Sequence, residues 1–140
     1  MLNAKFDSRF DASTLVSASF TDDSIPGRAF LRAVDAPNTL LLSQEVEDEY
    51  RDVLFRPKFD RWVSIERRQR ILDIITVSAA TIEPAEIVRE CIDPKDDKYL
   101  TLAAAGKADV IVSSDVHHLL SMHPWRGISI LSPADFLALE

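Results

Sequence analysis

The sequence predicts an α/β fold, a three-layer sandwich in which helices flank a short, mainly parallel sheet. Short apolar runs bounded by turn residues alternate with segments whose apolar side chains recur every three or four residues. Such alternation of strands and helices is typical of parallel sheets. The length of 140 residues, with 46% hydrophobic and 28% charged residues, fits a single domain, 1–140, with a substantial core.

The first strand is expected to end near Phe10. The residues before it include Lys5, Asp7 and Arg9, a polar composition for a central strand that is buried on both faces. We therefore expect that this strand is short, or that only Phe6 and Phe10 pack inward.

Capping residues locate the helices of the first half of the chain. One helix is expected from about Thr14, and another spans 26–34 with Pro in its first turn. Residues 39–42 (TLLL) read as a short buried strand. Two long amphipathic helices follow, and their predicted N-caps are Ser43 and Ser64.

The second half continues the alternation of helices and strands. Its expected elements are a helix from about Pro94 to Gly106, a buried strand within 108–114, a short helix over 117–122, a strand at 128–131 and a last helix opened by Ser132 and Pro133.

The formal net charge of −7 argues against a general nucleic-acid binder. Residues 51–70 are the exception, with seven Arg or Lys against three acids. This basic segment is either a solvated helical hairpin or a local surface for a polyanion. The absence of a long apolar run predicts no membrane span, and the single Cys91 fits a reducing, cytoplasmic location.

Carboxylates are predicted to gather at one edge of the sheet. Asp11 follows the first strand and Asp115 follows the strand within 108–114. In open α/β sheets, functional groups lie at the carboxyl ends of the strands. Asp97, or alternatively Asp96, stands in the first turn of the helix near Pro94. The first long helix offers a further acid, Glu49, with Glu45, Glu47 and Asp48 as alternatives.

Each acid alone has an ordinary structural explanation. Acids in the first turn of a helix offset the helix dipole, and an Asp after a strand is commonly a turn residue. Several carboxylates close together repel one another, however, and a divalent cation removes that conflict. Mg²⁺ or Mn²⁺ takes such oxygen ligands and supports water attack on a phosphoryl group. The combination therefore indicates a metal-dependent nuclease or phosphatase.

Five stretches in a fixed order resemble the motifs of one family. They are DASTLVSA (11–18), LSQEVEDEYRDVLFRPKF (42–59), CIDPKDDKYLTLA (91–103), ADVIVSSD (108–115) and HPWRGISILSPADFL (123–137). On these stretches the chain resembles the PIN-domain family, in the branch of toxins of toxin–antitoxin systems close to the VapC-type ribonucleases. The resemblance implies a PIN-like sandwich and a Mg²⁺- or Mn²⁺-dependent endoribonuclease. It also implies a cognate antitoxin and a homodimer.

The resemblance places four acids in the metal and catalytic site: Asp11, Glu49, Asp97 and Asp115, with Asp96 as the alternative third acid. Ser13 would orient Asp11 or touch a metal-bound water, and Ser113 takes the hydroxyl position before Asp115. The expected RNA contacts are Arg56, Lys58 and Lys98. Alternatively, Lys98 pairs with Asp97, and the other two basic side chains meet an acidic antitoxin segment.

Two other functions remain open on the sequence. An aspartate-nucleophile phosphatase also has an Asp after its first strand, but Ser13 replaces the second acid of its D-x-D motif. A non-catalytic interaction module would keep an acidic pocket without activity. His117 and His118 are interpreted as an exposed helical turn, and the metal scheme requires no histidine.

Overall fold

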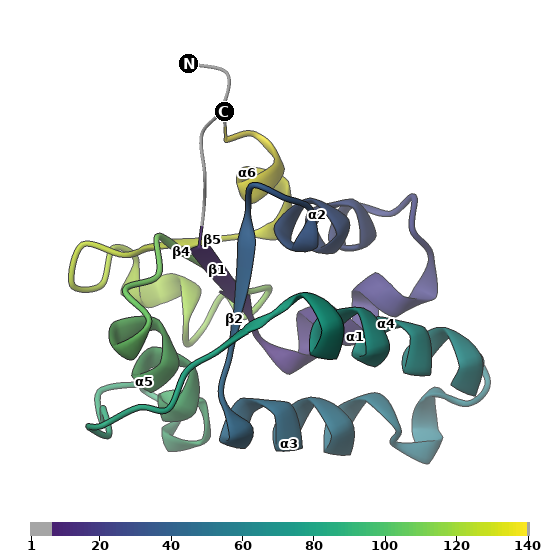
Figure 1. Cartoon of the computed structure of the whole chain (residues 1–140), viewed down its shortest axis with the longest axis horizontal. Helices are drawn as coiled ribbons and strands as arrows, with labels where there is room; N and C mark the ends of the chain where they lie inside the picture. The colour runs from purple at the N-terminus through teal and green to yellow at the C-terminus, as the bar shows by residue number, and fades with distance from the viewer. Residues whose placement is uncertain (1–6, 140) are drawn as a thin grey trace.

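The computed structural model describes residues 7–139 and contains a five-stranded sheet (Figure 1). All four pairings between neighbouring strands are parallel, as predicted, and the order is β3-β2-β1-β4-β5. The strands are β1 (Asp7–Phe10), β2 (Thr39–Leu42), β3 (Ala80–Thr81), β4 (Val110–Val112) and β5 (Ser129–Leu131).

Helices cover the sheet and connect its strands. They are α1 (Ala12–Phe20), α2 (Ile25–Val34), α3 (Gln44–Leu54), α4 (Ile65–Ser78), α5 (Asp97–Ala105) and α6 (Pro133–Leu137). Ser43, Ser64 and Ser132 each accept a hydrogen bond from the backbone N–H three residues on, so the three predicted N-caps are confirmed. Within the described residues, no helix is long and apolar enough to cross a membrane.

Three elements differ from the expected ones. The two-residue strand β3 was not predicted, because its neighbours carry no alternating apolar pattern. The helix expected from Pro94 is a 3₁₀ turn, Pro94–Asp96, followed by α5. The helix expected over 117–122 is reduced to a 3₁₀ turn, Leu120–Met122.

Of the two alternatives for the polar first strand, the short strand agrees with the four residues of β1, and the inward packing of Phe6 and Phe10 alone is wrong. β1 is the central strand of the sheet, and Ser8, Arg9 and Phe10 are all fully buried. Arg9 is accommodated because its guanidinium lies 4.0 Å from the centre of the Tyr99 ring. The expectation for Phe6 lies outside the described residues.

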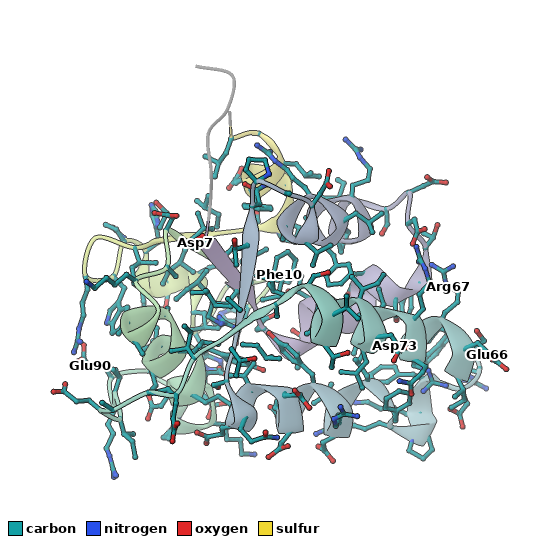
Figure 2. All side chains as sticks on the ribbon, in the orientation of Figure 1. Asp7, Phe10, Glu66, Arg67, Asp73 and Glu90 are labelled. Atoms are coloured by element: carbon teal, nitrogen blue, oxygen red, sulfur yellow. The ribbon has the colours of Figure 1, made fainter. Side chains whose placement is uncertain are left out.

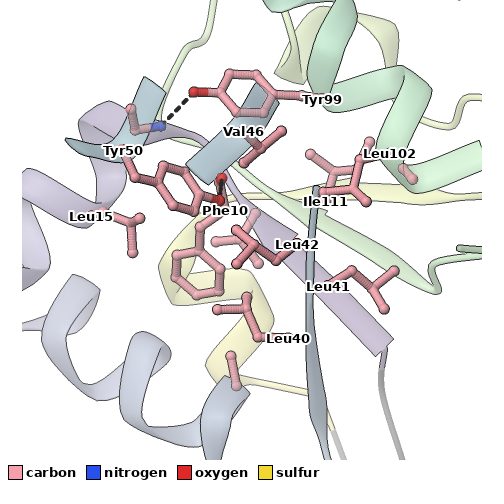
Figure 3. Packing of buried hydrophobic residues seen from close by; sticks show 14 of the residues in the cluster. Phe10, Leu15, Leu40, Leu41, Leu42, Val46, Tyr50, Tyr99, Leu102 and Ile111 are labelled. Atoms are coloured by element: carbon pink, nitrogen blue, oxygen red, sulfur yellow. Dashed lines mark hydrogen bonds between the residues drawn. The ribbon is translucent and has the colours of Figure 1, made fainter. Parts of the chain in front are cut away.

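The two faces of β1 meet different helices. Phe10 packs edge-on against Phe30 of α2 and Phe136 of α6, while α5 packs against the face that bears Arg9. Figure 3 shows the buried cluster around Phe10, with the hydroxyl of Tyr50 donating to the Phe10 carbonyl oxygen. The carboxyl end of β1 is therefore fixed by the hydrogen bond from Tyr50 of α3 and by the packing of Phe10 against α2 and α6.

The strand order places a topological switch point between β1 and β4. From β1 the chain proceeds to β2 and β3 on one side, whereas β4 leads to β5 on the other. Ligand sites of open α/β sheets lie at the carboxyl ends of the strands at such a point. Asp11 directly follows β1 and Ser113 directly follows β4, so both stand at this position.

Candidate metal centre

A pocket of about 280 Å³ lies at the carboxyl ends of β1 and β4. It is bounded by α1, α3 and the start of α5. Five of its lining residues are acids: Asp11, Glu49, Asp93, Asp96 and Asp115. The other lining residues are Ala12, Ser13, Val53, Arg56, Lys95 and Tyr99. Residues from four distant parts of the chain thus form a single acidic site.

Asp11 forms the floor of the pocket and is only 4% exposed. It is the N-cap of α1, where its Oδ1 accepts from the Thr14 N–H at 3.0 Å. Ser13 Oγ donates weakly to the same oxygen at 3.4 Å. The second carboxylate oxygen, Oδ2, accepts a hydrogen bond from Ser113 Oγ. These donors fix the orientation of the carboxylate, because one oxygen accepts from the first turn of α1 and the other accepts from the residue after β4.

Ser113 connects Asp11 to the loop after β4. Its buried hydroxyl donates to Asp11 and accepts from the Asp115 N–H at 2.9 Å. A second contact between the two strand ends joins Thr14 Oγ1 to Ser114 Oγ at 3.1 Å. The hydroxyl predicted to precede Asp115 therefore ties the first and last acids of the set together.

Glu49 reaches the pocket from α3. Its neighbours on that helix, Val46, Tyr50 and Val53, are buried, and this stripe turns Glu49 toward the end of β1. The carboxylate remains partly exposed and lies 3.7 Å from Lys98 Nζ. Lys98 thus pairs with Glu49, not with Asp97 as the sequence suggested as an alternative to phosphate binding.

Asp97 does not line the acidic pocket, although it was the preferred third acid. Its Oδ1 accepts from the Cys91 N–H at 2.8 Å, so the side chain holds the preceding loop and faces a neighbouring pocket. Asp96, the alternative, lines the acidic pocket instead. The 3₁₀ turn before α5 ends at Asp96, and the next residue points away from it by about 100° around the helix axis.

The pKa of Asp96 is raised from 3.8 to about 6. Partial burial is the largest cause, and the negative charges of Asp93, Asp11 and Asp115 add to it. Lys98 opposes the shift without cancelling it. The pocket therefore carries more negative charge than its own basic residues balance.

Asp93 and His118 belong to the site although sequence reasoning gave them no functional role. One ligand atom from each of Asp93, Asp96 and His118 lies within 4.8 Å of the others, close enough for one metal ion. His118 Nδ1 is 2.9 Å from Asp115 Oδ2, and this contact raises the pKa of His118. The three-residue spacing from Asp115 was the available signal, since a turn after a strand end brings such residues together.

The predicted RNA contacts separate in the structure. Arg56 lines the acidic pocket, as does Lys95, which was not predicted. Lys58 instead has its ammonium 5.2 Å from the centre of the Phe59 ring and is not among the lining residues. The pocket therefore has two basic residues at its rim, Arg56 and Lys95, beside the five acids.

The donor set fits a hard divalent cation. Five carboxylates surround one small pocket, two basic residues line it, and one of the acids resists ionisation. Mg²⁺ and Mn²⁺ prefer oxygen ligands, and Mn²⁺ also accepts an imidazole such as that of His118. A bound cation would offset the mutual repulsion of the carboxylates.

The fold and the site together define an α/β domain with an acidic pocket at the switch point of a parallel sheet. Comparison with protein families matches residues 9–117 to the PIN domain, and the chain belongs to that family. The PIN domain is generally a metal-dependent nuclease fold. No curated protein matches the chain.

Proposed function

We propose that this protein is a Mg²⁺- or Mn²⁺-dependent endoribonuclease that acts as the toxin of a type II toxin–antitoxin pair. The observation that carries the proposal is the convergence of Asp11, Glu49, Asp96 and Asp115 on one pocket at the end of the sheet. Family membership supports nuclease chemistry, and the resemblance to toxin sequences supports RNA as the substrate.

The four acids would hold the cation, with Asp93 and His118 positioned to complete its coordination. The cation supplies activation of a water molecule and neutralisation of charge on the phosphodiester. Ser113 keeps the Asp11 carboxylate in a fixed orientation, so the site needs little rearrangement before reaction. Arg56 and Lys95 at the rim would contact phosphates of the RNA strand.

The residues around Asp11 favour this proposal over an aspartate-nucleophile phosphatase. The D-x-D motif of such a phosphatase needs a second acid two residues after the nucleophile, and Ser13 stands at that position. A ligand role fits Asp11, because Oδ2 accepts a hydrogen bond from Ser113 and keeps a lone pair for a cation. Failure to trap an aspartyl-phosphate would agree with the nuclease proposal.

The test is cleavage of an RNA pool by the purified protein with Mn²⁺, with EDTA and with the variant Asp115→Asn. We expect cleavage with Mn²⁺ only, and none by the variant. Circular dichroism confirms that the variant is folded, and Glu47→Gln is the control for loss of a carboxylate outside the acidic pocket. Glu47 lies on the same helix as Glu49 but pairs with Arg51. Cleavage by Asp115→Asn at the wild-type rate would rule out the assignment, and metal binding without cleavage would favour an interaction module.

The toxin role adds a cytoplasmic location, which the single Cys91 fits, and a cognate antitoxin and a homodimer, which the family resemblance implies. Expression of the protein alone should arrest growth, and expression of Asp115→Asn should not. Light scattering of the purified protein measures its oligomeric state. Unimpaired growth with an enzyme that is active in vitro would separate the nuclease activity from the toxin role.

A further inference from the structure

Arg9 is a buried cation without a hydrogen-bonding partner among the described residues. The residue is fully buried in the central strand, and none of its three guanidinium nitrogens makes a hydrogen bond. Its guanidinium lies 4.0 Å from the centre of the Tyr99 ring, and the Tyr50 side chain is also close. Burial of a charge is strongly unfavourable unless an opposite charge offsets it.

The aromatic neighbours of Arg9 do not supply that opposite charge. Burial raises the pKa of Tyr50 to about 12 and raises the pKa of Tyr99 as well, so both phenols stay neutral. Their hydroxyls are also engaged, since Tyr50 donates to the Phe10 carbonyl and Tyr99 accepts from the Ala12 N–H at 3.0 Å. These contacts are drawn in Figure 3.

The acidic pocket is a source of negative charge close to Arg9. Arg9 and Asp11 are two residues apart on an extended backbone, so their side chains leave the same face of the sheet. Tyr50 and Tyr99 each lie within the electrostatic influence of both residues. Tyr99 lines the pocket on one side and stacks on Arg9. Arg9 therefore stands directly behind the pocket wall.

We propose that Arg9 is a built-in counter-cation of the acidic pocket, which stabilises the clustered carboxylates when no metal ion is bound and lowers their affinity for one. Arg9 acts through the field it adds and touches neither ion nor substrate, so it is a positioning residue. A guanidinium suits this role because it stays charged when buried. The part of the inference that concerns metal affinity rests on the proposed function.

A double-mutant cycle in metal-free protein tests the charge interaction. The melting temperatures of wild type, Arg9→Met, Asp11→Asn and the double variant are measured in EDTA at neutral pH. We expect Arg9→Met to lower the melting temperature in the wild-type background, and to lower it less, or raise it, in the Asp11→Asn background. Asn keeps the N-cap of α1, so the Asp11 variant folds.

Equal shifts in the two backgrounds would overturn the proposal. If Arg9→Met does not fold in the wild-type background, Arg9→Gln replaces it throughout the cycle. Failure of both neutral variants in the Asp11→Asn background would show that Arg9 is needed for packing alone, and would also overturn the proposal. Arg9→Lys keeps the charge and should retain the coupling to Asp11.

Calorimetric titration with Mn²⁺ tests the effect on metal affinity. Arg9→Met should bind Mn²⁺ about tenfold more tightly than wild type, because one cation near the site is removed. Arg61→Met is the matched control, since Arg61 also lies over an aromatic ring, that of Trp62, but on the surface. Unchanged affinity in Arg9→Met would contradict the metal part. If wild type binds no Mn²⁺ but the double-mutant cycle shows coupling between Arg9 and Asp11, the proposed function is refuted. The proposal that Arg9 stabilises the carboxylates in metal-free protein then still holds.

Discussion

The acidic pocket and the basic segment 51–70 differ in how far their charged side chains are paired within the chain. In the basic segment, Arg51, Arg56, Arg67, Arg68 and Arg70 all form ion pairs with nearby acids. The remaining two, Lys58 and Arg61, lie over aromatic rings. In the pocket, five acids meet two basic side chains, and Asp96 resists ionisation.

This difference shows which charges are structural. The seven basic residues of 51–70 looked in the sequence like a candidate binding surface, but each has a partner within the chain. Arg67 and Arg70 share Asp22 from the loop after α1, and Arg67 is labelled at the start of α4 in Figure 2. Apart from Arg56, which also lines the acidic pocket, these balanced charges maintain the fold. Charge left unbalanced at a strand end indicates a ligand.

The largest expected effect comes from separate substitutions of two neighbouring acids at the start of α5, Asp96 and Asp97. Asp96→Asn should reduce Mn²⁺-dependent RNA cleavage roughly a thousandfold, about 4 kcal/mol in barrier height, because it removes a cation ligand. Asp97→Asn should leave cleavage within a few-fold of wild type. It should cost about 1 kcal/mol of stability, because the bond from the Cys91 N–H is weakened. Single-turnover kinetics and thermal melting measure the two outcomes.

A reversed result, with Asp97→Asn inactive and Asp96→Asn active, would restore the sequence-based choice of third acid. It would also show that the loop holding Asp97 rearranges when substrate binds. Equal losses in both variants would mean that the turn as a whole, not one carboxylate, is required.

In the balanced region, Arg68→Met should destabilise the fold by about 2–3 kcal/mol. Arg68 is fully buried and donates to the Leu54 carbonyl at 3.1 Å and to Asp60 at 2.8 Å. The variant leaves that carbonyl without its buried donor. Urea unfolding measures the loss, and RNA cleavage by the folded fraction should be unchanged. A stability equal to wild type would mean that the pair contributes nothing net to the fold.

The contribution of Asp96 to stability should decrease as pH rises. An acid in an ion pair shows the opposite trend, because its stabilisation increases with pH. The folded-state pKa of Asp96 is raised from 3.8 to about 6, so ionisation above that range opposes folding. In metal-free protein the stabilisation from its protonated form is complete below 3.8 and is lost as pH rises through about 6. Asp96→Asn should therefore raise the melting temperature at neutral pH and have no such effect below 3.8.

Melting curves in EDTA across this range measure the effect. Asp97→Asn serves as the control, because the Asp97 carboxylate lies outside the acidic pocket. A melting temperature of Asp96→Asn that stays below wild type at neutral pH would contradict the charge imbalance inferred for the pocket.

The smallest effect is expected for an exposed pair of the basic segment. Arg70→Ala should change stability by about 0.5 kcal/mol, because Arg70 and Asp22 are both solvent-exposed and Arg67 remains as a partner for Asp22. Urea unfolding at low and high salt measures the change. A loss comparable with that of Arg68→Met would mean that exposure is a poor guide to the value of these pairs.

Much of the fold could be predicted because its signals are local. The serine caps at 43, 64 and 132 and the apolar strand at 39–42 all depend on a few adjacent residues. The burial of β1 could not be predicted, because it depends on Tyr99 reaching Arg9 from a helix about 90 residues away. The sequence gives no local sign of that contact.

The residues of the candidate site also differ in whether a local sequence signal predicts them. The strand-end positions of Asp11 and Asp115 follow from the topology of a parallel sheet, and the structure places both in the pocket. The choice between Asp96 and Asp97 depended on where the 3₁₀ turn gives way to α5, and helix boundaries are the least predictable feature of a helix. His118 was interpreted as part of an exposed helical turn, whereas in the structure it contacts Asp115 in the turn after β4.

Mn²⁺ binding measured by calorimetry is the most direct test of the claim that unbalanced carboxylates mark a metal site. Wild type and Asp97→Asn should bind the ion with equal affinity, and Asp115→Asn should bind it at least about tenfold more weakly. Equal binding by wild type and Asp115→Asn, or no binding by any of the three, would contradict the account.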